Sequence, residues 1–102
     1  MVVIRPENFT EYADIFEVNR LAFGQEDEAK LVENIRYIPN FNSALSLVAV
    51  ESDRLVGHIL FSEIAIASFR GDMTALALAP LAVLPEFQNR GIGSQLVRAG
   101  LK

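Results

Sequence analysis

The stretch that decides the fold is Leu81-Ala82-Val83-Leu84-Pro85-Glu86-Phe87-Gln88-Asn89-Arg90-Gly91-Ile92-Gly93-Ser94. An apolar run ends at a proline, a short polar loop with two glycines follows, and a helical pattern then begins. This order of strand, glycine loop and helix start leaves several backbone N–H groups unpaired and pointing in one direction. The helix dipole adds partial positive charge at the same place. The stretch therefore predicts an anion site suited to a phosphate.

The composition predicts one folded domain spanning residues 1–102. Hydrophobic residues make up 51% of the chain and charged residues 22%, which excludes a disordered protein. The longest apolar run, residues 75–84, contains Pro80 and is too short to cross a bilayer, so we expect no membrane segment. Arg5 and Glu7 interrupt any signal-peptide pattern at the N-terminus, and we expect a cytoplasmic protein.

Cysteine is absent and there is one histidine, which limits the chemistry of the chain. Disulfides, cysteine nucleophiles and thiolate or histidine-rich metal sites are excluded, so we expect no metal. The net charge of −4 argues against binding nucleic acid through a basic face. The charge is uneven, however, because residues 86–102 carry +2 and the rest of the chain carries −6. The positive part coincides with the predicted phosphate loop.

Hydrophobic periodicity and breaker residues predict seven elements in the order β-α-α-β-β-β-α. These are a strand at residues 2–5, a helix opened by a capping box of Asn8 and Glu11 and closed by Gly24, a helix over residues 26–38 closed by Pro39, strands at residues 45–51, 55–66 and 73–84, and a helix starting near Gly91.

Two of the predicted strands form a hairpin, and the last one carries an irregularity. Ser52-Asp53-Arg54 is read as a tight turn, and residues 68–72 as the next loop. Residues 73–84 are nearly all apolar, which is typical of a central strand buried on both faces. Pro80 cannot donate a hydrogen bond to a neighbouring strand, so we expect the pairing to fail or bulge there.

The element order predicts an α+β (α/β layered) domain with a mixed, mostly antiparallel sheet flanked by helices. A strand followed by a helix normally returns to another strand, but this chain stops at Lys102 within the last helix. We therefore expect a single, incomplete domain, truncated at its C-terminus, with an open edge on the last strand.

Three glycine-loop motifs were compared with the stretch. A P-loop requires a lysine after its second glycine, and Gly93 is followed by Ser94. A dinucleotide fingerprint requires Gly or Ala at the position that Leu96 occupies. The segment Gln88-Asn89-Arg90-Gly91-Ile92-Gly93 instead resembles the Gln/Arg-x-x-Gly-x-Gly/Ala signature of the GNAT superfamily of N-acetyltransferases. The apolar strand ahead of it and the order of elements resemble this superfamily too.

The resemblance covers the whole chain, as roughly the first two-thirds of such a domain. It implies an acyl-CoA N-acyltransferase-like fold, acetyl-CoA as cosubstrate, and transfer of the acetyl group to a primary amine by direct attack on the thioester. Backbone groups of Leu81, Ala82 and Val83 would pair with the pantetheine arm. The pyrophosphate would lie among the backbone N–H groups of the loop, with Arg90 adding charge; the loop residues are Gln88, Asn89, Arg90, Gly91, Ile92, Gly93 and Ser94.

The catalytic groups are much less evident than the cofactor loop. A backbone N–H near Pro80, that of Leu81 or Ala82, would polarise the thioester carbonyl. Residues 73–84 contain no titratable side chain, which departs from many family members. The candidate bases are Glu63 and His58 on the preceding strand and the helix-start acids, although each is more simply read as a structural or solvated residue; those acids are Glu26 and Glu28. The family's tyrosine acid would lie beyond Lys102, and Tyr12 and Tyr37 do not match its position.

Two further hypotheses remain open on the sequence alone. The missing strand carboxylate suits a non-catalytic acyl-CoA-binding module. The open apolar edge of residues 73–84 suits a structural remnant that associates with a second copy as a homodimer. The acceptor amine is not identified, although the acids at residues 26–28 suit a cationic acceptor.

Overall fold

The computed structural model describes residues 1–38, 41–66 and 73–101, with side chains described outside residues 62–79. The seven predicted elements occur in the predicted order. They are β1 (Val3–Pro6), α1 (Tyr12–Phe23), α2 (Asp27–Arg36), β2 (Ser46–Glu51), β3 (Arg54–Ile66), β4 (Met73–Val83) and α3 (Ile92–Gly100), with 3₁₀ turns η1 (Phe9–Glu11), η2 (Ser43–Leu45) and η3 (Pro85–Phe87).

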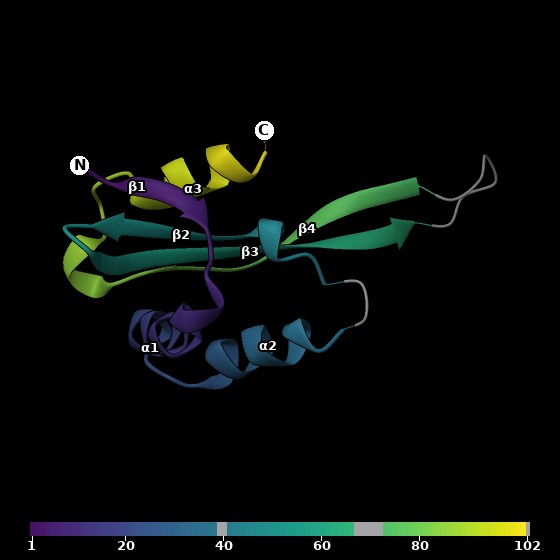
Figure 1. The fold of residues 1–102 in the computed structure, drawn as a ribbon, viewed down its shortest axis with the longest axis horizontal. Helices are drawn as coiled ribbons and strands as arrows, with labels where there is room; N and C mark the ends of the chain where they lie inside the picture. Colours follow the sequence, from purple (N-terminus) through teal and green to yellow (C-terminus); the bar gives the residue numbers. More distant parts are fainter. Residues whose placement is uncertain (39–40, 67–72, 102) are drawn as a thin grey trace.

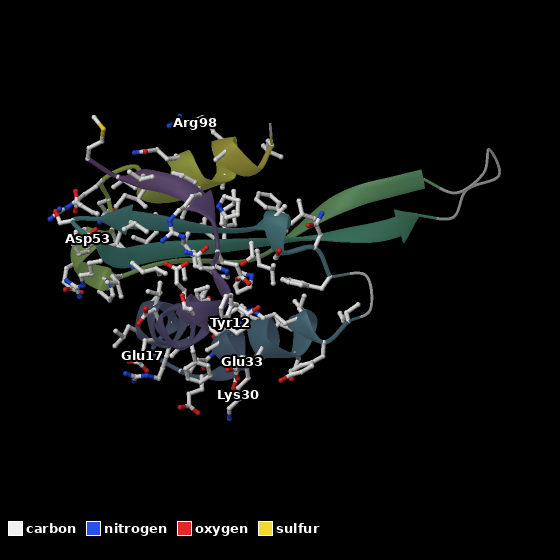
Figure 2. All side chains as sticks on the ribbon, viewed as in Figure 1. Tyr12, Glu17, Lys30, Glu33, Asp53 and Arg98 are labelled. Atoms are coloured by element: carbon white, nitrogen blue, oxygen red, sulfur yellow. The ribbon has the colours of Figure 1, made fainter. Side chains whose placement is uncertain are left out.

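The strands form one four-stranded antiparallel sheet in the order β1-β2-β3-β4. Helices α1 and α2 lie against one face of the sheet, and α3 lies against the other (Figure 1). The predicted α+β layered fold with a mostly antiparallel sheet flanked by helices is therefore confirmed. Charged side chains point outward from both helical layers, as Glu17, Lys30 and Arg98 show (Figure 2).

The boundaries of some elements differ from the sequence predictions. Helix α2 ends at Arg36 rather than at residue 38, because the N–H groups of Tyr37 and Ile38 bond to carbonyls three residues back, at Asn34 and Ile35. Such bonds tighten the last turn into 3₁₀ form. The predicted stop at Pro39 and the predicted loop at residues 68–72 lie outside the described residues.

The predicted turn between β2 and β3 is confirmed and is very short. Glu51 pairs directly with Arg54, so Ser52 and Asp53 alone form the connection. Both have left-handed backbones, with φ of 51° and 64°. This is the conformation at both central positions of a type I′ hairpin turn, whose twist matches that of the flanking strands. Arg54 is thereby placed as the first residue of β3.

The predicted break at Pro80 is a bulge in β4. Ile59 pairs with Leu81 and Phe61 with Leu78, so Ala79 and Pro80 together oppose the single residue Leu60. Proline at a bulge removes no ladder hydrogen bond, because the extra residue is unpaired in any case. Beyond the bulge, regular pairing with β3 resumes over Leu81, Ala82 and Val83.

The position of β4 in the sheet differs from the one that its composition suggested. The strand was predicted to be central, but in the described part of the chain it lies at an edge, with β3 on one side only. Among its described side chains, those of Pro80 and Ala82 are buried, and α1 packs against the strand. An open edge leaves no mark on composition, because it exposes backbone rather than side chains.

Two apolar clusters pack the helices onto the sheet. The larger one joins the sheet to α3 through Ile59, Phe61, Ile92 and Leu96, and it also includes Val18 of α1. The smaller one joins the sheet to α1 and α2 through Ile15, Val32, Val48 and Leu60. On α3, the side chains of Ile92 and Leu96 are buried against the sheet.

A buried chain of hydrogen bonds adds a polar link between the α1–α2 layer and the sheet. Asn19 Nδ2 lies 3.2 Å from His58 Nδ1, and His58 Nε2 lies 2.9 Å from Ser46 Oγ. Ser46 Oγ donates to Glu7 Oε1, which also accepts from Arg36 at 2.9 Å. The Asn19, Ser46 and His58 residues are fully buried. The chain therefore joins α1, α2, β2, β3 and the segment before η1.

The directions of these hydrogen bonds follow from the donors available. Asn19 Nδ2 donates to Ile15 O at 3.0 Å and, with its second hydrogen, to His58 Nδ1. His58 is then a neutral imidazole with its hydrogen on Nε2. His58 Nε2 donates this hydrogen bond to Ser46 Oγ, and the Ser46 hydroxyl donates its own hydrogen bond to Glu7. Burial, aided by the nearby Arg36 charge, lowers the pKa of His58 to about 3.

The charged end of the chain is an ion pair shielded from water. The side chains of Arg36 and Glu7 are 9% and 1% exposed, and the Arg36 guanidinium lies 3.9 Å over the Tyr12 ring. Removing one partner of such a pair leaves the other charge buried, at a cost of about 3–5 kcal/mol. The polar chain therefore fixes the two helices against the sheet with directional contacts that the apolar clusters lack.

We expect acid to weaken the fold through His58. Its folded pKa of about 3 lies below the ordinary value of 6.5, so the unfolded state binds more protons between these values. The stability contribution is complete above pH 6.5 and is lost as the pH falls toward 3. Urea unfolding between pH 7 and pH 5 should show the free energy of unfolding falling by up to about 1.4 kcal/mol per pH unit below pH 6.

The control for this prediction is His58→Gln, because it removes the only histidine in the chain and keeps a polar side chain. The variant should be less stable at pH 7 and should lose the slope between pH 6 and pH 5. An unchanged slope in the variant would contradict the assignment to His58.

A second prediction concerns the contact between α3 and β3. A Cβ at Gly100 would lie 1.9 Å from Phe61 Cε2, and Phe61 is 3% exposed and cannot move aside. Gly to Ala within a helix normally stabilises by about 1 kcal/mol. Here we expect Gly100→Ala to destabilise by about 1–3 kcal/mol in chemical denaturation, the usual cost of overpacking. Adding Phe61→Leu should recover part of that loss, whereas a stabilised Gly100→Ala variant would refute the contact.

Candidate functional site

The predicted phosphate loop leads from β4 into α3 through two left-handed residues. Asn89 and Gly91 have φ of 66° and 80°, and α3 begins at Ile92. The first α-helical bond of α3 runs from Gln95 N to Gly91 O, at 3.0 Å. The N–H groups of Ile92, Gly93 and Ser94 come before it and have no partner within the helix. They form the positive end of the α3 dipole, as predicted.

The loop encloses a cavity of about 240 Å³. Six of the seven predicted loop residues line it, all but Arg90; the full lining is Val83, Phe87, Gln88, Asn89, Gly91, Ile92, Gly93 and Ser94. A second cavity of about 510 Å³ is lined by Leu81, Gly93, Ser94, Val97 and Arg98. Because the two cavities share Gly93 and Ser94, they adjoin along the N-terminal turn of α3 beside β4.

The free edge of β4 presents backbone groups at alternate residues. Leu84 N–H donates to Val56 O on β3 at 2.9 Å, so the groups of Val83, one residue earlier, point away from β3. Val83 O indeed accepts from Gln88 Nε2 at 3.0 Å. By the same alternation Leu81 faces the free edge, whereas the backbone groups of Ala82 face β3. Of the three strand residues expected to pair with pantetheine, Leu81 and Val83 have the free groups.

The candidate bases lie in other surroundings. His58 is buried and fully bonded, as its simpler structural reading predicted. Glu26 is exposed and forms an ion pair with Lys30 at 3.5 Å, and Glu28 accepts from Gln25 at 2.9 Å. None of these three lines the two cavities. The side chain of Glu63 lies outside the described ones.

Sequence reasoning missed several residues around the site. Val97 and Arg98 line the second cavity. They follow Gly93 and Ser94 by four positions, and this spacing places them on the same face of α3, so the sequence could have indicated them. Phe87 lines the loop cavity from η3, and no pattern marked it.

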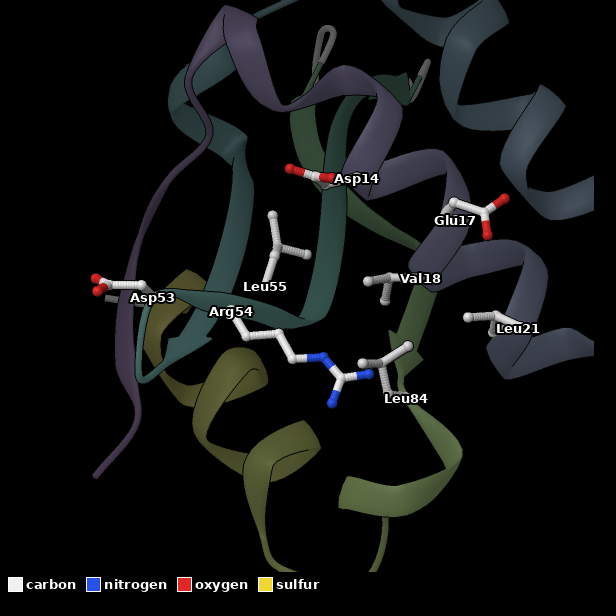
Figure 3. A pocket seen from close by; sticks show the side chains of 8 residues that line it. All are labelled: Asp14, Glu17, Val18, Leu21, Asp53, Arg54, Leu55 and Leu84. Atoms are coloured by element: carbon white, nitrogen blue, oxygen red, sulfur yellow. The ribbon is translucent and has the colours of Figure 1, made fainter.

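A third cavity, of about 310 Å³, lies between α1 and the start of β3 (Figure 3). Its lining is Asp14, Glu17, Val18, Leu21, Asp53, Arg54, Leu55 and Leu84. The Arg54 side chain extends from β3 toward Leu84, which lies between β4 and η3. Its guanidinium group therefore points away from Asp14.

The described residues offer neither a cluster of metal ligands nor a membrane-spanning helix. Within the described residues, His, Asp and Glu side chains do not come together in a group of three that suits a metal ion. Each helix of the described part is too short or too polar to cross a bilayer.

The Acetyltransferase (GNAT) family matches residues 10–102. The uncharacterized N-acetyltransferase YjhQ of Escherichia coli K12 is 42% identical over 96 residues, which cover 91% of this chain and 51% of that protein. The uncharacterized N-acetyltransferase YhbS of the same organism is 31% identical over 98% of this chain and 58% of that protein. The chain thus spans about half the length of these relatives.

A similar solved structure is that of a GNAT family acetyltransferase from Brucella melitensis in complex with acetyl-CoA. It matches with a TM-score of 0.87 and 34% sequence identity, covering 99% of this chain and 66% of that one. The family match over most of the chain, the sheet with its bulge at Pro80 and the glycine loop at the start of α3 agree with one another. The chain belongs to the GNAT family of acetyltransferases.

Proposed function

We propose that this chain binds acetyl-CoA and serves an N-acetyltransferase that moves the acetyl group to a primary amine. The observation that carries the proposal is the pair of adjoining cavities, which runs from the α3 N-terminus along the free edge of β4. The Brucella melitensis relative, described in complex with acetyl-CoA, supports the choice of ligand. The lack of cysteine is in keeping with the cytoplasm that we expect.

The loop cavity is assigned to the pyrophosphate. Unpaired N–H groups at the first turn of a helix, together with its dipole, favour a doubly charged group. The left-handed Gly91 turns the backbone into α3, and a glycine meets no steric cost in that conformation. The predicted ligands are the loop residues from Gln88 to Ser94; Arg90, which does not line the cavity, would add positive charge beside it.

The β4 edge is assigned to the pantetheine arm, whose amides would extend the sheet as an added strand does. Leu81 and Val83 offer backbone donors and acceptors there, whereas Ala82 faces β3. Val83 O is bonded to Gln88 Nε2 in this structure, at 3.0 Å. A pantetheine amide would therefore replace the Gln88 side chain at this carbonyl, so the acceptor keeps a partner in both states.

The edge also supplies a group for the chemical step. The amine nitrogen attacks the thioester carbonyl carbon, the C–S bond breaks, and the CoA thiolate leaves and takes up a proton. The Leu81 N–H points to the free edge next to the bulge, where it can donate to the oxyanion that forms. The amine must first lose a proton to a base. Residues 81–83 carry no titratable side chain, so the base would come from another segment or act through water.

The binding part of the proposal is tested by calorimetry with acetyl-CoA on the full-length protein. We expect micromolar or tighter binding, and we expect Gly91→Glu to abolish it, because a carboxylate would enter the phosphate site. The matched control is Gly24→Glu at the end of α1. Gly24 has a similar φ of 70° and equally open surroundings, so the backbone strain is the same. Loss of binding in both variants, or no binding by the parent protein, would contradict the site.

The catalytic part is tested by thiol release from acetyl-CoA with a panel of primary amines. Release above the hydrolysis rate with at least one amine is expected, and it should disappear in Gly91→Glu. Tight binding without amine-dependent release from any member of a broad panel would favour the alternative, a non-catalytic acyl-CoA-binding module. What supports that alternative is the lining of the two cavities, because no Asp, Glu or His is among the described residues that line them.

A further inference from the structure

Two guanidinium groups from distant parts of the sequence lie over one aromatic ring beside the cavity of the glycine loop. The Arg90 Cζ is 5.1 Å from the centroid of the Phe87 ring, and the Arg54 Cζ is 5.5 Å from it. Arg54 is the first residue of β3, Phe87 lies in η3 and Arg90 lies in the glycine loop. A half-buried ring holds both cations by cation–π attraction, which sets their position beside the loop.

This cluster adjoins the phosphate loop but is distinct from its backbone N–H groups. Phe87 lines the loop cavity, whereas Arg54 and Arg90 do not. The two cations therefore lie outside the pocket assigned to the pyrophosphate, on the side reached from η3 and the β2–β3 turn. A ligand that filled the pocket with one phosphate group would reach them only with a second anionic group.

The charges of the cluster are only partly balanced within it. Arg54 Nη2 lies 3.2 Å from Glu86 Oε2, and both side chains are more than half exposed. Arg90 forms no ion pair within the described residues. The cluster therefore carries a net charge of +1, in a chain whose net charge is −4. An unneutralised guanidinium beside a half-neutralised one is suited to a phosphate monoester, which carries close to two negative charges at neutral pH.

We propose that Arg54, Phe87 and Arg90 form a subsite for the 3′-phosphate on the ribose of coenzyme A. This inference rests on the proposed acetyl-CoA function and extends it to ligand selection, because the chain would distinguish acetyl-CoA from its 3′-dephospho form. Arginine binds phosphate oxygens through paired N–H groups, and a guanidinium that stacks on a ring keeps its N–H edge free for this. Arg54 and Arg90 already lie over the Phe87 ring, so the ring is not free to stack on the adenine base of coenzyme A. The cluster therefore suits the 3′-phosphate better than the adenine.

Glu86 has an opposing role in this subsite. Its carboxylate accepts a hydrogen bond from Arg54 and would repel an incoming phosphate. Binding of the phosphate therefore requires Arg54 to exchange one anion for another. Because the pair is exposed to water, it adds little stability to the fold. Removing the Glu86 charge should strengthen phosphate binding without disturbing the fold.

The test is calorimetry with acetyl-CoA and with 3′-dephospho-acetyl-CoA on the full-length protein. We expect acetyl-CoA to bind about tenfold more tightly, the ratio that one charge-assisted hydrogen bond gives. Arg54→Gln and Arg90→Gln should each lower this ratio to below about threefold, chiefly by weakening acetyl-CoA. Glu86→Gln should raise the ratio, and a gain in affinity cannot arise from misfolding.

The control variant is Arg20→Gln, which removes one positive charge from the surface of α1, where Arg20 pairs with Glu17. It should leave the ratio unchanged, which separates a local contact from the net charge of the protein. Equal affinity for the two ligands in the parent protein would overturn the subsite and leave the proposed function intact. A ratio that Arg54→Gln and Glu86→Gln do not change would also overturn it. Failure of both ligands to bind would instead refute the proposed function.

Discussion

The interaction on which the rest of the site depends is the pairing of β3 with β4 on either side of the bulge at Ala79 and Pro80. A strand directs its backbone groups alternately to its two sides, and one extra residue reverses which positions face outward. Because of the bulge, Leu81 and Val83 face the free edge while Ala82 pairs with β3. The same shift fixes where β4 ends and η3 begins. The loop that starts α3 is therefore placed beside the edge that would bind the rest of the ligand.

The two helical layers meet the sheet in different ways, and the difference bears on the site. Helix α3 is held by close apolar packing, with Gly100 touching Phe61 so tightly that a methyl group does not fit. Helices α1 and α2 are held by apolar contacts and, in addition, by the buried chain from Asn19 to Arg36. Hydrogen bonds specify one geometry where apolar contacts tolerate several, so the polar chain fixes the register of this layer. One cost is visible, since the buried Asn19 Oδ1 has no partner within the described part of the chain.

Sequence reasoning succeeded where the signal was local. The loop, the bulge at Pro80 and the hairpin turn each depend on residues close together in the chain, where proline and glycine act directly on the backbone. It failed where partners are far apart. Asn19 and His58 are separated by 39 positions, as are Ser46 and Glu7, and no spacing rule connects them. The open edge of β4 was expected from the order of elements and not from its composition, because an apolar strand looks the same whether or not a neighbour pairs with its edge.

The placement of α3 supports the proposed phosphate site in a chain whose net charge is negative. The net charge of −4 repels a phosphate at long range. The affinity for a phosphate must therefore come from groups within a few ångströms of it. Unpaired N–H groups serve this purpose only if their direction is fixed before the ligand arrives, because ordering them on binding would cost affinity. The buried Ile92 and Leu96 fix α3 on the sheet from its first turn onward. The packing of the helix thus gives the glycine loop the defined geometry that the proposed anion site requires.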